Sequence, residues 1–215
     1  MARVSLVYPK MPGSKNCSSG RCVAFEKYDG TNLHWVWERE LGWYAFGTRR
    51  NRFDLDEQGI AEFETAHPGL SEAAILFQNE WAQPLHEMFF TNPDYAVEEI
   101  TVFTEYLGEE SFAGRHKPDD PKQLILFDVE LPEGFLAPET FIQDFGKWQI
   151  ARVIYEGRLT GKFIHDVREG YYDVKEGVVC KGVEEDQIWM VKIKTHEYMN
   201  RLKAAFADSW EDYWE

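Results

Sequence analysis

Residues 26–32 read Glu-Lys-Tyr-Asp-Gly-Thr-Asn, and this stretch decides how the rest of the chain is interpreted. It places Lys27 at the end of a largely apolar run, directly before Asp29-Gly30. An Asp-Gly pair between two such runs is a strong hairpin signal. The pattern therefore predicts strands over 22–28 and 33–37, joined by a tight turn. Taken alone, a lysine beside a turn is typical of any solvated hairpin, because short motifs recur by chance.

Two segments near the other end of the chain add information. Glu176-Gly177-Val178-Val179 opens a strand predicted over 177–181, and Lys192-Ile193-Lys194 ends one predicted over 188–194. Side chains two residues apart in a strand share a face, so Lys192 and Lys194 lie side by side. Like charges so placed destabilise a sheet unless an anion lies between them. Each segment alone fits a solvated strand, and only the ordered set indicates a site.

In order and content the three segments resemble the covalent nucleotidyltransferase superfamily, which comprises ATP-dependent RNA and DNA ligases and GTP-dependent capping enzymes. The first family motif, Lys-x-Asp-Gly, matches residues 27–30. The fourth, Glu-Gly-hydrophobic-hydrophobic, matches 176–179, and the fifth, Lys-x-Lys, matches 192–194. Residues 103–108 are similar to the family strand whose glutamate binds ribose, and residues 124–129 to the strand whose aromatic ring stacks on the purine.

The resemblance implies that Lys27 is the catalytic nucleophile and attacks the α-phosphate of ATP to form lysyl-AMP. Lysine attacks only as the free amine, and a pKa of ~10.4 leaves about one in 2,500 neutral at pH 7. Neighbouring cations and desolvation both lower that pKa. Lys192 and Lys194 are implied to supply this like charge and to stabilise the leaving pyrophosphate. Glu176 is implied to hold Mg²⁺ or Mn²⁺, because such hard cations prefer oxygen ligands.

The resemblance also implies a set of nucleotide contacts. Glu105 would accept hydrogen bonds from the ribose hydroxyls, and Phe127 would stack on the base. Arg50, or failing that Arg49, falls in the short basic motif of the family and would contact a phosphate. Glu26, beside the nucleophile, belongs to the same nucleotide-binding set.

Residue Asn32 selects a branch of the superfamily. DNA ligases of this class usually carry arginine at this position, whereas Asp-Gly-Thr-Asn is similar to the RNA ligases, in which the asparagine assists the later steps of sealing. The expected substrate is RNA with a 5′-phosphate and a 3′-hydroxyl end, in RNA repair. The alternatives are a nucleotidyltransferase with another acceptor (a DNA end, a protein or a small molecule) and a degenerate module that binds nucleotide or RNA without turnover.

The coarse pattern predicts an α+β fold with antiparallel or mixed sheets flanked by helices, because the strands come in hairpins rather than in βαβ units. The best helix signal covers 71–90, with Pro84 as a kink. Further strands are predicted over 43–47, 100–106 and 123–131, and helices over 138–145, 159–168 and 196–207.

Residues 1–215 are expected to form one nucleotidyltransferase domain that ends in a short helix and an acidic tail. After Lys194 there remain 21 residues. The five strands of an OB domain need roughly 40. We therefore expect no OB domain.

Composition limits the partners. The chain has 23 Lys and Arg against 38 Asp and Glu, a net charge of −15. This excludes a generic basic nucleic-acid coat but permits a small positive site on an acidic body, or a basic partner protein that supplies further contacts. No apolar run approaches ~20 residues, so no membrane span is expected. Three cysteines, an odd number, favour the reducing cytoplasm over a disulfide framework.

Overall fold

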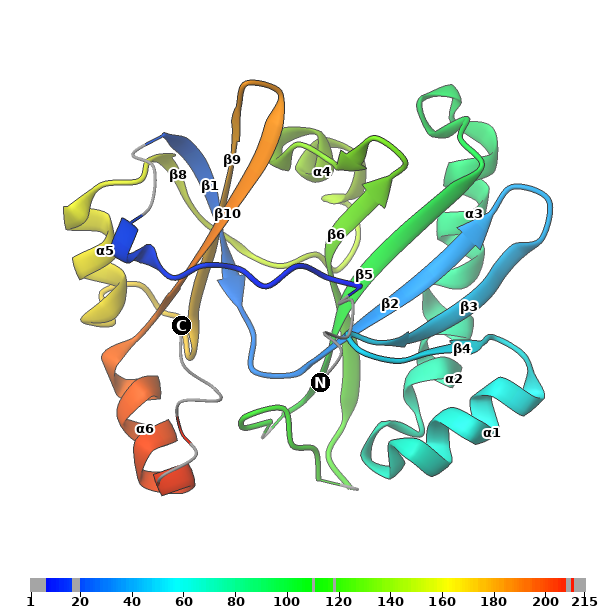
Figure 1. The fold of residues 1–215 in the computed structure, drawn as a ribbon, viewed down its shortest axis with the longest axis horizontal. Coiled ribbons are helices and arrows are strands. Elements are labelled where there is room, and N and C mark those ends of the chain that lie inside the picture. Colours follow the sequence, from blue (N-terminus) through cyan, green and yellow to red (C-terminus); the bar gives the residue numbers. More distant parts are fainter. Residues whose placement is uncertain (1–6, 17–19, 110, 118, 208–209, 211–215) are drawn as a thin grey trace, which may run out of the picture. The chain divides into compact units, whose positions relative to one another are not determined.

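The computed structural model in Figure 1 describes residues 7–16, 20–109, 111–117, 119–207 and 210. The chain forms two compact units. Unit 1 comprises Met1–Pro9 and Gly30–Leu136, and unit 2 comprises Lys10–Asp29 and Ala137–Glu215. Each unit contains one antiparallel sheet with its own helices. The predicted α+β class with antiparallel sheets flanked by helices is confirmed.

The sheet of unit 2 has four strands in the order β10-β9-β1-β8. Alternate residues of β1 and β9, including Cys22, Ala24 and Cys180, pack into an apolar cluster with Phe163 and Val167 of α5. The intervening residues, which include Lys27, therefore belong to the opposite face. The elements are β1 (Arg21–Lys27), β8 (Val153–Arg158), β9 (Gly177–Glu184), β10 (Gln187–Lys194), α4 (Pro138–Phe145), α5 (Gly161–Arg168), α6 (His196–Phe206) and the 3₁₀ turn η1 (Ser14–Asn16).

Unit 1 contains the larger sheet, with six strands in the order β4-β3-β2-β5-β6-β7. Its core forms around Trp35, whose ring stacks on Phe77 of α2 at 4.0 Å and on Phe46 of β3 at 5.4 Å. The elements are β2 (Thr31–Glu38), β3 (Gly42–Thr48), β4 (Arg52–Asp54), β5 (Glu99–Gly108), β6 (Lys122–Leu131), β7 (Gly134–Phe135), α1 (Glu57–Ala66), η2 (Pro68–Leu70), α2 (Ala73–Glu80), α3 (Ala82–Thr91) and η3 (Pro93–Tyr95).

The single helix predicted over 71–90 is wrong, because the segment forms α2 and α3 with a break at Trp81. Proline has no N–H and its ring clashes with the carbonyl four residues earlier, which here belongs to Glu80, the last residue of α2. Pro84 therefore lies in the first turn of a new helix, where its missing donor costs nothing. Among the described residues, no helix is long and apolar enough to cross a membrane.

The hairpin predicted at Asp29-Gly30 is also wrong. Strand β1 pairs with β8 and β9, whereas β2 pairs with β3 and β5, so the turn connects two different sheets. Gly30 serves a close approach rather than a hairpin turn. A Cβ at this position would overlap the carbonyl oxygen of Tyr106. Its N–H donates to Glu105 Oε1 at 3.0 Å.

Candidate active site

One end of the sheet in unit 2 gathers three of the predicted catalytic groups. Lys27 of β1 and Lys194 of β10 both lie opposite Gly177, the first residue of β9. Glu176 directly precedes that glycine. The Lys27 ammonium lies 2.7 Å from Glu176 Oε1, and the Lys194 ammonium lies 3.2 Å from the same oxygen. Strand register thus brings two cations to one carboxylate.

Gly177 makes this row of residues sterically feasible. Its φ of +155° lies in the region that favours glycine. A Cβ there would overlap the carbonyl oxygen of Ile193 on β10. The Glu-Gly pair therefore has a physical explanation: the glycine allows β9 to begin against β10, and the glutamate before it lies beside both lysines.

Burial gives the cluster unusual electrostatics. Glu176 is 2% exposed, and its Oε2 atom has no hydrogen-bond partner among the described residues. Burial lowers the pKa of Lys194, an effect that Glu176 opposes and the Lys27 cation reinforces. A buried carboxylate oxygen requires a partner. A divalent cation fits, since carboxylate oxygen is its preferred ligand.

No group of three or more His, Cys, Asp or Glu side chains suited to a metal occurs in the described parts of the chain. A cation bound at Glu176 would therefore complete its coordination with water and phosphate oxygens, as Mg²⁺ commonly does. Lys192 shares the face of Lys194, two residues earlier on β10, and its N–H donates to the carbonyl of Pro12 at 3.1 Å.

The start of α6 supports the same cluster from below in sequence. Thr195 caps the helix, accepting from the N–H of Tyr198 at 3.1 Å, and its own N–H donates to the Glu176 carbonyl at 2.9 Å. The Tyr198 hydroxyl hydrogen-bonds Asp29, and the Lys194 ammonium lies 5.1 Å from the Tyr198 ring centre. Burial, with Glu176 and Asp29, raises the pKa of Tyr198, so this hydroxyl remains a donor.

Unit 1 carries a second group of predicted site residues. Asn32 and Glu105 lie opposite each other on β2 and β5. Glu105 accepts the N–H of Gly30 at 3.0 Å. The Asn32 Oδ1 atom is buried and has no hydrogen-bond partner in the described part of the chain. These groups are polar but are not arranged as ion pairs.

Phe127, the predicted base-stacking ring, packs beside an N-terminal residue that sequence reasoning missed. The Tyr8 ring meets Phe127 edge-on at 5.3 Å and Phe103 at 5.0 Å. Its hydroxyl donates to Asp128 Oδ2 at 2.8 Å, and that carboxylate is only 1% exposed. Tyr8 thus fixes one edge of the aromatic ring.

The structure distinguishes the two arginines of the basic motif. Arg49 Nε donates to the carbonyl of Tyr8 at 2.8 Å, and another of its nitrogens donates to the carbonyl of Pro9. Arg49 therefore holds the N-terminal segment. The Arg50 guanidinium is exposed and makes no hydrogen bond or ion pair among the described residues, which leaves it available to a phosphate.

Comparison with solved structures identifies the fold, although no family model and no curated protein matches the chain. An archaeal ATP-dependent RNA ligase matches with a TM-score of 0.59 and 16% identity, over 93% of this chain and 51% of that one. A Naegleria gruberi RNA ligase with PPi matches with a TM-score of 0.56 and 16% identity, over 86% and 52%. A mutant of the Naegleria ligase with ATP and Mn matches with a TM-score of 0.53 and 15% identity, over 85% and 52%.

The chain has the fold of these ATP-dependent RNA ligases. It spans about half the length of each ligase it matches. The resemblance inferred from the motifs is confirmed at the level of fold. Residues 27–30, 176–179 and 192–194, which carried the resemblance, lie on the sheet of the ligase fold in unit 2 or at its edges.

Within this ligase fold, Lys181 is a fourth lysine on the Lys27 face that sequence analysis left without a role. It is 3% exposed, and its ammonium lies 5.2 Å from the Phe25 ring centre and 5.7 Å from that of Phe141. Cation–π contact of this kind stabilises a charged lysine away from water. The only sequence signal was its place four residues after the Glu-Gly pair.

Glu26 is committed to a partner on the same ligase sheet. Its Oε2 accepts from Arg152 Nε at 2.9 Å, and the Tyr28 hydroxyl also bonds it. Burial, with Glu26 next, raises the pKa of Tyr28 to about 12. The nucleotide contact assigned to Glu26 stays a prediction.

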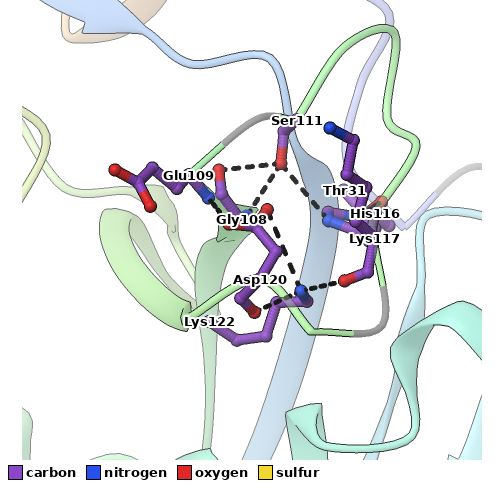
Figure 2. A network of polar contacts seen from close by, with 8 residues as sticks. All are labelled: Thr31, Gly108, Glu109, Ser111, His116, Lys117, Asp120 and Lys122. Atoms are coloured by element: carbon purple, nitrogen blue, oxygen red, sulfur yellow. Dashed lines mark hydrogen bonds and ion pairs between the residues drawn. The ribbon is translucent and has the colours of Figure 1, made fainter.

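Figure 2 shows how unit 1 of the ligase fold anchors the start of β2. Thr31 Oγ1 lies 2.9 Å from His116 Nε2, and His116 Nδ1 lies 3.3 Å from Ser111 Oγ. Ser111 in turn accepts the N–H of Gly108 at 2.7 Å. Burial, followed by the Lys122 cation, lowers the pKa of His116 to about 4, so the ring is neutral at pH 7. This network holds Thr31 between Gly30 and Asn32.

The predicted site residues therefore divide between the units. Those on unit 2 are charged and converge on Glu176, with Glu26 paired elsewhere. Those on unit 1 bind backbone, pack against rings or await a partner. Unit 2 holds Glu26, Lys27, Glu176, Lys192 and Lys194, and unit 1 holds Asn32, Arg50, Glu105 and Phe127.

Proposed function

We propose that the chain is an ATP-dependent RNA ligase that works through a lysyl-AMP intermediate on Lys27. The observation that carries the proposal is the row in which Lys27 and Lys194 share one oxygen of buried Glu176. A structural ion pair needs one cation for one carboxylate. A second lysine, and a second carboxylate oxygen without a partner in the described residues, fit a site that receives phosphate and a metal ion.

In the first step, the Lys27 nitrogen forms a bond to the α-phosphorus of ATP as the bond to the pyrophosphate oxygen breaks. Lys27 must first lose a proton, and Glu176 Oε1 at 2.7 Å is an acceptor within reach. Lys192 and Lys194 neutralise the charge that develops on pyrophosphate.

A divalent ion, Mg²⁺ or Mn²⁺, would be held through Glu176 and would supply charge neutralisation at the phosphates. Glu176 Oε2 is the atom that fits this role, because it is buried with no hydrogen-bond partner among the described residues. The same oxygen is the reason to expect metal-dependent activity.

The nucleotide contacts follow the motif assignments. Glu105 accepts from the ribose hydroxyls, Phe127 stacks on the base, Arg50 binds a phosphate, and Glu26 belongs to the same set. The edge-on contact of Tyr8 with Phe127 supports a fixed ring orientation, which suits stacking.

In the later steps, AMP passes from Lys27 to the 5′-phosphate of RNA, and a 3′-hydroxyl then displaces AMP to seal the strand. Asn32, whose buried Oδ1 lacks a partner in the described part of the chain, is assigned to these steps. Residues 1–215 act as one nucleotidyltransferase domain, in cytoplasmic RNA repair, with a basic partner protein as a further source of RNA contacts.

Acidity favours a second candidate, a nucleotidyltransferase whose acceptor is not RNA. Unit 1 contains 21 Asp and Glu against 8 Lys and Arg, a balance that repels polynucleotides. A protein, a small molecule or a DNA end would then receive AMP. The chemistry at Lys27 would be unchanged.

The test is a denaturing gel after incubation with labelled ATP and Mg²⁺ or Mn²⁺. We expect a labelled band for the wild type and for Lys175→Ala, a matched exposed lysine, and none for Lys27→Ala. Release of the label during sealing of 5′-phosphorylated RNA supports the ligase. A band without sealing supports another acceptor, and no band with any nucleotide supports a binding module.

A further inference from the structure

Positive charge is divided unequally between the two units. Unit 2 contains 15 Lys and Arg against 17 Asp and Glu, whereas unit 1 contains 8 against 21. Polynucleotide binding depends on clustered cations at phosphates. If the proposed ligase function holds, on which this inference rests, RNA phosphates away from the reacting ends belong on unit 2.

Arg21 and Arg158 stand directly opposite each other on β1 and β8. Both are exposed, and neither guanidinium makes an ion pair or hydrogen bond with any described residue. The neighbouring carboxylates Glu156 and Glu184 pair with neither arginine. Like charges directly opposite in a sheet are destabilising, so this pair carries a cost that nothing in the described chain offsets.

A second like-charged pair in the fold shows what compensation looks like. Glu38 and Glu99 stand opposite each other on β2 and β5. There the Tyr44 hydroxyl donates to Glu99 Oε2 at 2.6 Å, and Arg52 donates to that hydroxyl at 2.6 Å. The arginine pair lacks any such counterpart, which indicates that its counterpart is an external anion.

The arginine pair belongs to the same face of the sheet as the nucleophile. Cys22 and Ala24 of β1 point into the apolar cluster under α5, so Arg21 and Lys27 alternate onto the other face. Six residues separate Arg21 from Lys27, which is about 20 Å along a strand. An anion at Arg21 is therefore distant from the α-phosphate that Lys27 attacks.

We propose that Arg21 and Arg158 form a phosphate-binding site for the backbone of the RNA substrate, several nucleotides from the end being sealed. Two guanidinium forks that face one phosphate group provide the planar, bidentate contacts that arginine makes best. Binding of the phosphate removes the repulsion between the two cations. The site contributes to RNA affinity and not to lysyl-AMP formation.

The test compares two double variants that lose the same charge from unit 2. Arg21→Gln with Arg158→Gln removes the site, and Lys10→Gln with Lys162→Gln removes two exposed lysines, of which Lys162 is 82% exposed and paired with Asp166. Binding of 5′-phosphorylated single-stranded RNA of 3 and of 12 nucleotides is titrated at several salt concentrations. Labelling with ATP is measured on the same samples.

We expect the arginine variant to bind the 12-nucleotide RNA about 10-fold more weakly at low salt, with a salt slope shallower by about 1.4 for two lost contacts. Binding of the 3-nucleotide RNA and labelling by ATP should be unchanged. The lysine variant should resemble the wild type. Arg158→Gln alone should unfold at a temperature no lower than the wild type, because it relieves repulsion.

Equal losses in both double variants would show a nonspecific charge effect and overturn the proposal, as would wild-type affinity in the arginine variant. A lower unfolding temperature for Arg158→Gln would show that the pair is structural. A weaker affinity for the 3-nucleotide RNA, or slower labelling, would mean that the anion recognised is the nucleotide. Failure of the wild type to label would instead contradict the proposed function, whatever the RNA result.

Discussion

The two sheets of the molecule treat their site residues in opposite ways. In unit 2, Lys27 and Lys194 contact one oxygen of Glu176, and two of these three side chains are almost fully buried. In unit 1, Asn32 and Glu105 form no such ion pairs, and Glu105 accepts a backbone N–H. The first arrangement concentrates charge, and the second arranges hydrogen-bonding groups.

The difference indicates a division of labour. Buried charges are costly unless each is paired, so the cluster in unit 2 is sensitive to the loss of any member. Charge that is concentrated before the reaction is suited to stabilising charge that develops during it. Hydrogen-bonding groups such as those in unit 1 are suited to recognising a ligand, so their loss should affect affinity more than rate.

The strongest test of this division is Glu176→Gln beside Glu105→Gln. Glu176→Gln should slow single-turnover labelling of Lys27 by about 100-fold or more, because both lysines lose their shared anion and the metal its ligand. Glu105→Gln should mainly raise the ATP concentration needed for half-maximal labelling, by about 10-fold. Glu156→Gln, an exposed glutamate on β8, serves as the control, with circular dichroism to verify folding. A larger rate loss in Glu105→Gln would invert the comparison.

A second test separates the steps of sealing. Asn32 lies on β2 in unit 1, outside the charged cluster, so Asn32→Ala should still form lysyl-AMP at the wild-type rate. Sealing of RNA supplied with its 5′ end already adenylylated should fall by about 50-fold, since Asn32 Oδ1 has no partner among the described residues and is available to the substrate. The two rates are measured on gels with labelled ATP and labelled RNA. Equal loss of both would assign Asn32 a structural role at the start of β2.

Sequence reasoning succeeded where the information was local. The alternation of Lys192 and Lys194 and the Glu-Gly pair at the start of a strand both depend on backbone periodicity, which a single segment contains. The ordered motifs then supplied the expectation that distant segments meet. The structure adds the register, with Lys27 and Lys194 both opposite Gly177.

The errors arose where pairing is nonlocal. Asp29-Gly30 has the composition of a hairpin, but β1 pairs with β8 and β9, more than 120 residues away. Local turn chemistry cannot distinguish a hairpin from a link between sheets. The apolar spacing of 71–90 continues across the break at Trp81, so periodicity alone suggested one helix. Tyr8 and Tyr198 belong to no motif, and only tertiary contacts connect them to the site.

A third test uses the neutral histidine that the sheet of unit 1 buries where unit 2 buries lysines. Burial, with Arg52 next, lowers the pKa of His34 to about 4, against ~6.5 for an exposed histidine. Between these values the unfolded chain binds a proton that the folded chain does not, so stability falls as pH decreases through the window. The contribution of His34 to the free energy of unfolding should fall by about 2 kcal/mol from pH 7.5 to pH 5.

Urea unfolding followed by tryptophan fluorescence at both pH values measures this effect. His34→Gln should show a smaller loss between pH 7.5 and pH 5 than the wild type, whereas His165→Gln, an exposed histidine on α5, should match the wild type. His116, whose pKa is also lowered to about 4, keeps part of the dependence in every variant. An identical pH dependence in His34→Gln would mean that His34 is not the group being titrated.

The smallest expected effect concerns Tyr198, which makes two separable contacts with the charged cluster. Its hydroxyl bonds Asp29, and its ring lies 5.1 Å from the Lys194 ammonium. Tyr198→Phe keeps the ring, so labelling should slow only about 5-fold, roughly 1 kcal/mol for one hydrogen bond to a carboxylate. Tyr198→Leu also removes the ring and the cation–π support of Lys194, so labelling should slow further and its pH profile should shift to lower pH. If Phe and Leu have the same rate and pH profile, the ring contributes nothing to Lys194, and the charge cluster of unit 2 depends on Glu176 alone.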